Sequence, residues 1–121
     1  MTTRMHSGLL SLRDYGDAYG VLFLSTIVVP LAEVLDDEMS GKQVAIRYWI
    51  ADAPCTREDV NESLMRKVTG VAETQFGSEY SYDTGYLGTY EECKIGSHDL
   101  MNELRDAVGK WLILEIEVHA Q

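Results

Sequence analysis

The sequence predicts an α+β fold with a mainly antiparallel sheet and two α-helices, at about 56–70 and 98–108. A small open barrel is one arrangement that such a sheet could take. Two observations support this class. Strand patterns occur in clusters with helical segments inserted between them, without the regular βαβ alternation of a parallel sheet. The chain has 121 residues, 45% of them hydrophobic, which suits one globular domain over residues 1–121.

The N-terminal part is typical of a β-hairpin. Apolar runs at 9–12 and 21–24 flank residues 14–20, which are rich in aspartate, glycine and tyrosine, as in a turn. Residues 42–50 alternate apolar and polar side chains and predict a further strand.

The C-terminal part contains the strongest strand pattern, at 110–119. One face of this strand is wholly apolar, and the other changes from apolar to charged along its length. Two shorter strands are expected near 79–82 and 91–95, separated by a turn that contains Gly85.

Residues 31–39 fit two structures. Apolar residues at helical spacing follow Pro30, which is favoured at the start of a helix. However, three consecutive acids, 36–38, would lie at the C-terminal end of that helix, where its dipole disfavours anions. A strand over 31–35 followed by a loop is the preferred interpretation, and the helix is the alternative.

Start and stop signals define the two expected helices. Thr56 and Asp59 form an approximate capping box, and Gly70 is the expected stop. Ser97 is the expected N-cap of the helix at 98–108, and Gly109 ends it. The buried stripes are expected at Val60, Leu64, Val68 and Val71 in the first helix, and at Leu100, Met101, Leu104, Ala107 and Val108 in the second.

The chain is strongly acidic, with 20 Asp and Glu against 10 Lys and Arg and a net charge of −10. Proteins that bind nucleic acid or anionic membranes directly need a basic patch, so neither partner is expected. Residues 79–121 hold nine acids and three bases, which concentrates the excess in the last third. No secretory leader or membrane span is recognised, and two isolated cysteines suggest a reduced compartment, so we expect a cytoplasmic protein.

Tyrosine is concentrated in the segment 79–90, where Tyr82, Tyr86 and Tyr90 lie among Ser, Gly, Thr and Asp. This mixture is typical of recognition surfaces, because tyrosine offers a large contact area with few rotatable bonds. Tyr15 and Tyr19 occupy a second loop of similar composition. The alternative is that these tyrosines simply fill half-buried strand positions.

The acids of the last third could form a charged surface beside these tyrosines. A protein partner is therefore expected, and an array that mimics the phosphates of a duplex is one form of such a surface. The alternative is that the charge only keeps the protein soluble. The predicted binding residues are Tyr82, Tyr86, Tyr90, Glu91, Glu92, Asp99, Glu103 and Asp106, and Glu115 and Glu117 extend the acidic array.

A small enzyme or metal-dependent protein centred on His98, Cys93 and Glu92 is the competing hypothesis. Catalysis would need these groups to converge, and consecutive residues at a helix start point in different directions. A metal site would draw on the same segment, with Glu91 and Asp99 added, but one cysteine and one histidine do not form a zinc pattern. We therefore expect no catalytic residues, no metal and no cofactor.

Three segments, 47–50, 84–87 and 95–116, resemble small uncharacterised proteins of bacterial and prophage genomes. The resemblance covers about half of the chain and implies a bacterial, prophage-related context, but no activity. It favours a host or phage protein as the partner. A homo-oligomer whose tyrosines form its own interface is a third hypothesis.

Overall fold

The computed structural model describes residues 2–16, 18–80, 82–83, 85 and 87–119. Within them, seven strands form one sheet in the order β2-β1-β7-β3-β4-β5-β6. The elements are β1 (Thr2–Tyr15), β2 (Ala18–Leu24), α1 (Leu31–Met39), β3 (Gln43–Ala51), β4 (Arg66–Tyr80), β5 (Leu87–Ile95), β6 (His98–Asp99), α2 (Leu100–Asp106) and β7 (Trp111–Val118), with short 3-10 turns at Arg57–Asp59 and Glu62–Leu64.

The predicted α+β class with a mainly antiparallel sheet is confirmed. All neighbouring strands in the order pair antiparallel, and the sheet stays open. One additional contact, between Ala18 and Leu87, joins β2 to β5 in parallel.

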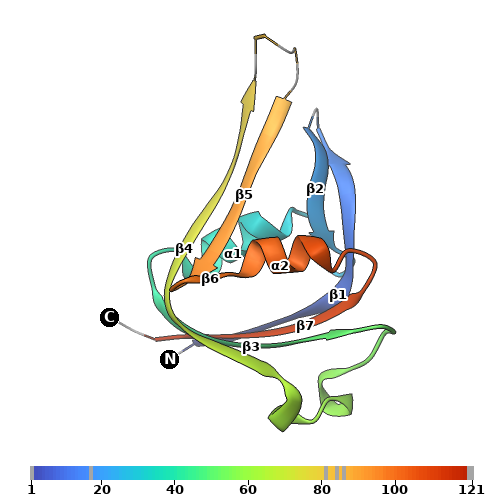
Figure 1. Ribbon diagram of the computed structural model, residues 1–121, viewed down its shortest axis with the longest axis vertical. Helices are drawn as coiled ribbons and strands as arrows, with labels where there is room; N and C mark the ends of the chain where they lie inside the picture. The colour runs from blue at the N-terminus through green and yellow to red at the C-terminus, as the bar shows by residue number, and fades with distance from the viewer. Residues whose placement is uncertain (1, 17, 81, 84, 86, 120–121) are drawn as a thin grey trace.

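Two long strands divide the molecule into a floor and two arms (Figure 1). The first part of β1 pairs with β7, and its second part pairs with β2. Likewise, β4 pairs first with β3 and then, from Ala72, with β5. The floor is therefore β3, β7 and the lower halves of β1 and β4. We call the hairpin at residues 10–24 the β1–β2 arm and the hairpin at 72–95 the β4–β5 arm.

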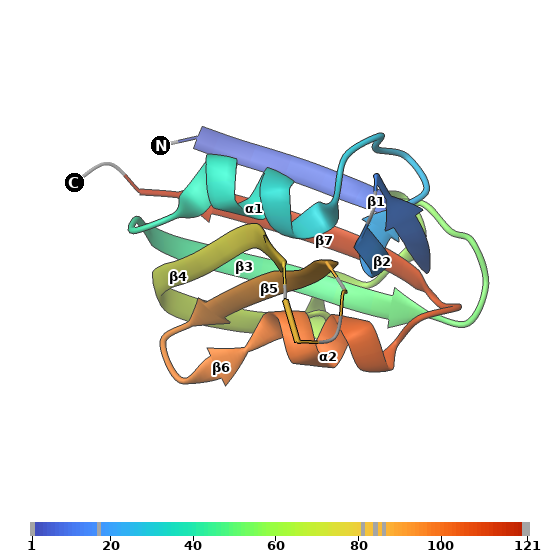
Figure 2. The same cartoon turned by 90° about the horizontal axis from the view of Figure 1, so that it is seen from above.

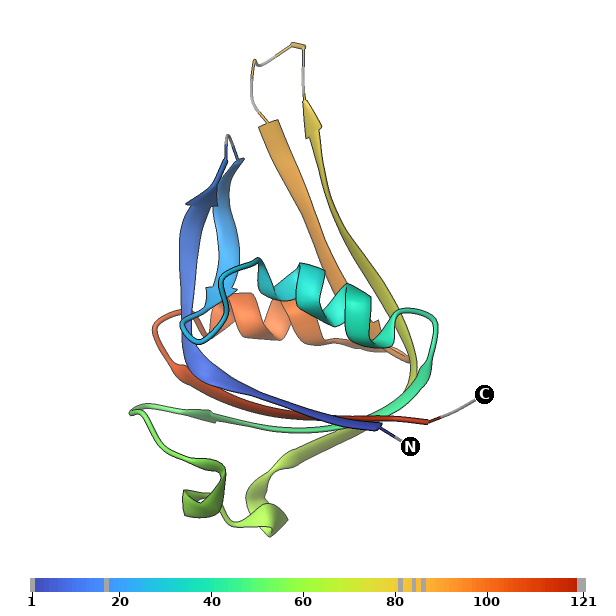
Figure 3. The same ribbon diagram turned by 180° about the vertical axis from the view of Figure 1, so that it is seen from behind.

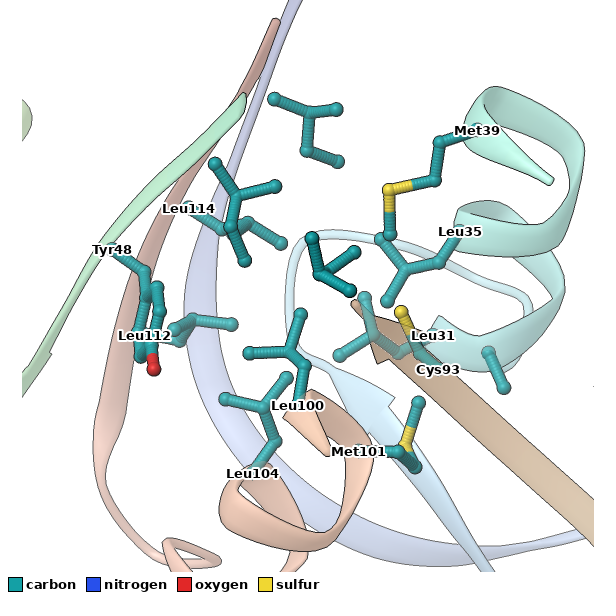
Figure 4. Packing of buried hydrophobic residues seen from close by; sticks show 14 of the residues in the cluster. Leu31, Leu35, Met39, Tyr48, Cys93, Leu100, Met101, Leu104, Leu112 and Leu114 are labelled. Atoms are coloured by element: carbon teal, nitrogen blue, oxygen red, sulfur yellow. The ribbon is translucent and has the colours of Figure 1, made fainter. Parts of the chain in front are cut away.

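The helices close the space between the floor and the arms. Figures 1 and 3, from opposite sides, show both helices above the floor at the base of the arms, and Figure 2 shows them on opposite sides of the molecule. Both helices and the inner face of the sheet contribute to one apolar core (Figure 4), whose fully buried members include Leu31, Leu35, Met39, Tyr48, Leu100, Leu104, Leu112 and Leu114. The predicted strands at 42–50 and 110–119 and the N-terminal hairpin are confirmed.

The helix predicted at 56–70 is wrong. The Thr56–Asp59 capping interaction exists, with Asp59 accepting from the Thr56 backbone N–H at 2.9 Å, but it caps a single 3-10 turn. Val60 is buried, but Leu64 and Val71 are 60% and 47% exposed, so the expected apolar stripe does not form. From Arg66 onward the chain gains more by pairing with β3, and this tertiary pairing overrides the local helix signal.

Gly70, the expected stop of that helix, instead lies within β4. A Cβ atom at Gly70 would come within 3.0 Å of the Gly96 backbone nitrogen. The absence of a side chain therefore allows two backbone segments to approach closely.

The preferred strand at 31–35 is also wrong, because Leu31–Met39 is helix α1. The acids near its C-terminus have partners that offset the unfavourable dipole. Asp36 accepts from the Thr74 hydroxyl at 2.5 Å, and both carboxylate oxygens of Glu38 lie 2.9 Å from His6 Nε2.

The second predicted helix exists as α2, but it is shorter than 98–108. Its N-cap is Asp99, which accepts from the Asn102 backbone N–H at 3.0 Å, and not Ser97. His98 and Asp99 form the short strand β6 before the helix begins. Val108 is 38% exposed and does not belong to the buried face. Of the strand expected near 79–82, residues 79–80 end the much longer β4, Tyr82 lies in a turn, and residue 81 is outside the described residues. The strand expected near 91–95 is part of β5.

Candidate functional site

The structure brings the two tyrosine-rich loops of the sequence to the same end of the molecule. Each loop lies at the tip of one arm, and the arms lean together until Ala18 of β2 pairs with Leu87 of β5 (Figures 1 and 3). We call this end, with the two tips and the tyrosines beside them, the tip surface. Neither loop alone predicts it, because it depends on a contact between distant parts of the chain.

The tyrosines of the tip surface are exposed. Tyr82 is 92% exposed and Tyr19 is 65% exposed, while Tyr15 and Tyr90 are exposed by 41% and 46%. Tyr86, the remaining tyrosine in the predicted binding set, lies outside the described residues. Tyr82 lies in a turn, and the other three exposed tyrosines lie in strands of the two arms. Exposed aromatic rings on two adjoining hairpins are typical of surfaces that recognise other proteins.

Aromatic packing supports the tip surface from beneath. The Tyr15 ring packs against Phe23 at a centroid distance of 5.9 Å and against Phe76 of the other arm at 6.5 Å. Phe23 lies in a small buried cluster with Ala18 and Val21, against which Phe76 packs. Arg13 lies over the Phe23 ring at 5.4 Å. Side chains from both arms therefore share a small core of their own.

Glu91 ties the arms together below the tips. Its side chain is only 3% exposed, and its Oε1 accepts from the Leu22 backbone N–H of β2 at 2.9 Å. Its Oε2 accepts from Arg105 of α2, which also donates to the Gly20 carbonyl at 3.1 Å. The Glu91 carboxylate is thus used within the fold and does not face a partner.

Tyr90 is held on the outer side of the β4–β5 arm. Its hydroxyl donates to Glu79 at 3.0 Å, and this hydrogen bond raises the pKa of Tyr90. A Cβ atom at Gly77, the residue paired with Tyr90 across the hairpin, would meet the Tyr90 ring at 3.3 Å. Glycine at this position therefore lets the ring lie flat over the strand.

The predicted acidic array does not form a single row of free carboxylates. Besides Glu91, Glu103 is paired with Arg66, and Glu115 is paired with Arg57 and, at 3.1 Å, with Arg47. Glu115 is 8% exposed and lies against the outer side of the floor. The other array members are Glu92, which pairs with Lys94 at 3.1 Å; Glu117, which lies 3.6 Å from His119; and the exposed Asp99 and Asp106.

The residues of the competing enzyme hypothesis are placed in different environments. The Cys93 thiol is buried in the main core, and burial raises its pKa to about 12, so it is neutral and unreactive at ordinary pH. Glu92 lies on the opposite face of β5 with Lys94.

His98 belongs to a hydrogen-bonded group with Tyr48 and Glu103. The Tyr48 hydroxyl donates to Glu103 Oε1, which leaves its oxygen to accept a hydrogen bond from the His98 Nε2–H at 2.9 Å. His98 Nε2 is also 3.3 Å from Glu103 Oε1. Burial, and then the hydrogen bond to Glu103, raise the pKa of Tyr48, whose side chain is fully buried. This arrangement satisfies polar groups at the edge of the core and gives a substrate no access to Tyr48.

Among the described residues, no group of three or more His, Cys, Asp or Glu side chains is placed to hold a metal ion. No helix in that part of the chain is long and apolar enough to cross a membrane. Compared with family models, curated proteins and solved structures, the chain matches none of them.

Sequence reasoning identified the tyrosines but missed the residues that position them. The roles of Phe23, Phe76 and Arg105 depend on contacts between distant segments. The one available signal was the similar composition of the two loops, both rich in tyrosine, glycine and aspartate.

Proposed function

We propose that this protein works by binding another protein through the tip surface, in the cytosol of a bacterium and in a prophage-related context. The observation that carries the proposal is the convergence of two tyrosine-bearing tips, with Tyr19 and Tyr82 exposed by 65% and 92%. Exposed tyrosines of this kind commonly provide the strongest contacts in protein interfaces.

The charge of the arms indicates a basic partner. Residues 10–24 and 72–95 contain seven acids and two bases, a net charge of −5, which is half of the charge of the chain. Complementary charge accelerates association and weakens with salt. A duplex-mimicking row of carboxylates has less support, because Glu91, Glu103 and Glu115 are engaged by arginines of the chain itself.

A pull-down from bacterial lysate tests the proposal when three forms of the protein are compared. The wild type is expected to retain a specific protein at low salt and less of it at high salt. The double variant Tyr19→Ala/Tyr82→Ala should lose it by at least about tenfold. Leu64→Ser is the matched control, because Leu64 is an apolar residue, 60% exposed, in the 3-10 turn Glu62–Leu64, which belongs to neither arm.

Retention of the same protein by the wild type and the double variant at equal levels would contradict the proposal, as would the absence of any specific protein. If the solution mass shows a dimer that the double variant abolishes, the tip surface is an interface between copies of this chain, and the proposed partner is wrong.

A further inference from the structure

The upper half of β4 has an open edge. Ala72 exchanges backbone hydrogen bonds on the β3 side, donating to the Lys42 carbonyl at 2.9 Å and accepting from the Gly41 N–H at 2.8 Å. Backbone groups of alternate residues in a strand point to the same side, so those of Thr74, Phe76 and Ser78 also point away from β5. The pairing with β3 ends at Val71.

Nothing in the described part of the chain pairs with the Phe76 and Ser78 backbone on this side. The edge of β2 is different, because the Glu91 carboxylate accepts from its Leu22 N–H and Arg105 donates to its Gly20 carbonyl. The edge of β2 is thus filled by side chains, as is usual for protected edges, whereas this edge of β4 is left open.

A groove of about 530 Å³ lies beside this open edge. It runs between β4 and helix α1, and it is lined by Asp36, Thr74, Gln75, Phe76, Gly77 and Tyr90. Asp36 is the one charged residue in this lining. The next two acids of α1, Asp37 and Glu38, line a different hollow beside Arg4 and Lys42. The Asp36 carboxylate therefore gives the groove a negative charge beside the open backbone edge of β4.

We propose that the partner inserts an extended, basic segment into this groove, where it pairs with β4 as an added strand and places a lysine or arginine at Asp36. This mode takes its affinity from backbone hydrogen bonds and its specificity from side-chain pockets along the edge. The inference rests on the proposed function, since it describes how the same basic partner is held.

The charge argues against a second copy of this chain as the occupant. Each chain has a net charge of −10, and two β4 edges paired about Gly77 would bring two sets of acids from β4 and α1 together. Like charges across a strand pair are destabilising. A basic segment removes this repulsion.

A synthetic seven-residue peptide of alternating lysine and valine, blocked at both ends, is the probe. We expect it to shift the amide NMR signals of residues 74–78 of the full-length protein and to slow hydrogen exchange at Phe76 and Ser78. A peptide N-methylated on the residues that face β4 should bind at least about tenfold more weakly, because it lacks the backbone donors. A peptide with glutamate in place of lysine should not bind.

Ser78→Pro removes a backbone donor from β4, just as N-methylation removes backbone donors from the peptide. Proline removes the N–H that faces the open edge and leaves the hydrogen bonds to β5 intact, while Ser78→Ala keeps that N–H. Ser78→Pro should weaken binding of the peptide at least about tenfold, and Ser78→Ala should bind like the wild type. Equal binding of the methylated and unmethylated peptides would overturn the proposal even if Ser78→Pro failed to fold, as would pairing of two β4 edges in a dimer.

The same variants separate this inference from the proposed function. If Ser78→Pro folds and still retains the lysate protein that Tyr19→Ala/Tyr82→Ala loses, the tip surface binds the partner and strand addition is wrong. If none of the variants reduces the amount of lysate protein that is retained, the tip surface does not bind that protein, and the proposed function is wrong.

Discussion

Replacing Glu91 with alanine should destabilise the protein by about 2–3 kcal/mol. Leu22 is fully buried, and its backbone N–H donates to Glu91 at 2.9 Å, so the alanine variant leaves a buried donor unsatisfied. That alone costs about 1–3 kcal/mol. Loss of the contact with Arg105 adds at most about 1 kcal/mol, because the Arg105 side chain is 38% exposed.

Urea unfolding followed by tryptophan fluorescence measures this difference. Glu91→Gln should lose only about 1 kcal/mol, because the amide oxygen still accepts from Leu22. Glu92→Ala is the matched control, since the next side chain is 40% exposed and should change stability by less than about 0.5 kcal/mol. If Glu91→Ala is no more destabilising than Glu92→Ala, the Glu91 carboxylate does not hold the two arms together.

Three further predictions concern the core. Iodoacetamide at pH 8 should label Cys55, which is partly exposed, and leave Cys93 unlabelled until the protein unfolds; rapid labelling of both thiols would contradict the buried position of Cys93. The fold raises the pKa of Cys93 and of Tyr48 and so favours their neutral forms. The free energy of unfolding should therefore fall as the pH rises above about 9, the usual pKa of a thiol. In Tyr48→Phe this fall should be less steep above pH ~10, and urea unfolding at several pH values measures both effects. Gly70→Ala should cost about 1–3 kcal/mol, because its Cβ atom would press on the Gly96 backbone at 3.0 Å; unchanged urea stability would show that this contact is not tight.

The sequence predicts best where one pattern repeats over several residues. Alternate residues of 110–119 form one wholly apolar face, and this segment is β7; the two apolar runs around the Asp/Gly loop form the β1–β2 hairpin. These patterns of apolar residues are typical of strands and do not have the spacing of a helix.

Prediction from the sequence fails where contacts with residues far along the chain outweigh the local preference for helix or strand. Thr56 and Asp59 make the expected capping contact, yet pairing of Val68 with Ile46 draws the following residues into β4. In α1, acids that disfavour a helix end are stabilised by partners such as Thr74, far along the chain. Neither influence is visible in a local stretch of sequence.

The candidate site shows the same division. Composition predicts Tyr82 and Tyr90 as binding residues, and both are exposed; it also predicts Glu91, which is instead a buried link between the arms. Its alternation on β5 with Cys93 and Ile95, both core residues, is consistent with an inward position. The partner contacts that fix this role come from β2 and α2.

Site-specific photo-cross-linking tests whether the two arms form one binding surface. p-Benzoylphenylalanine is placed at Tyr19, at Tyr82 and, as a control, at Leu64, and cross-linked proteins are identified by mass spectrometry from irradiated bacterial cells. The first two positions are expected to capture the same protein, and position 64 is not. Capture of unrelated proteins from the two tips, or of the same proteins from all three positions, would show that the arms do not form one binding surface.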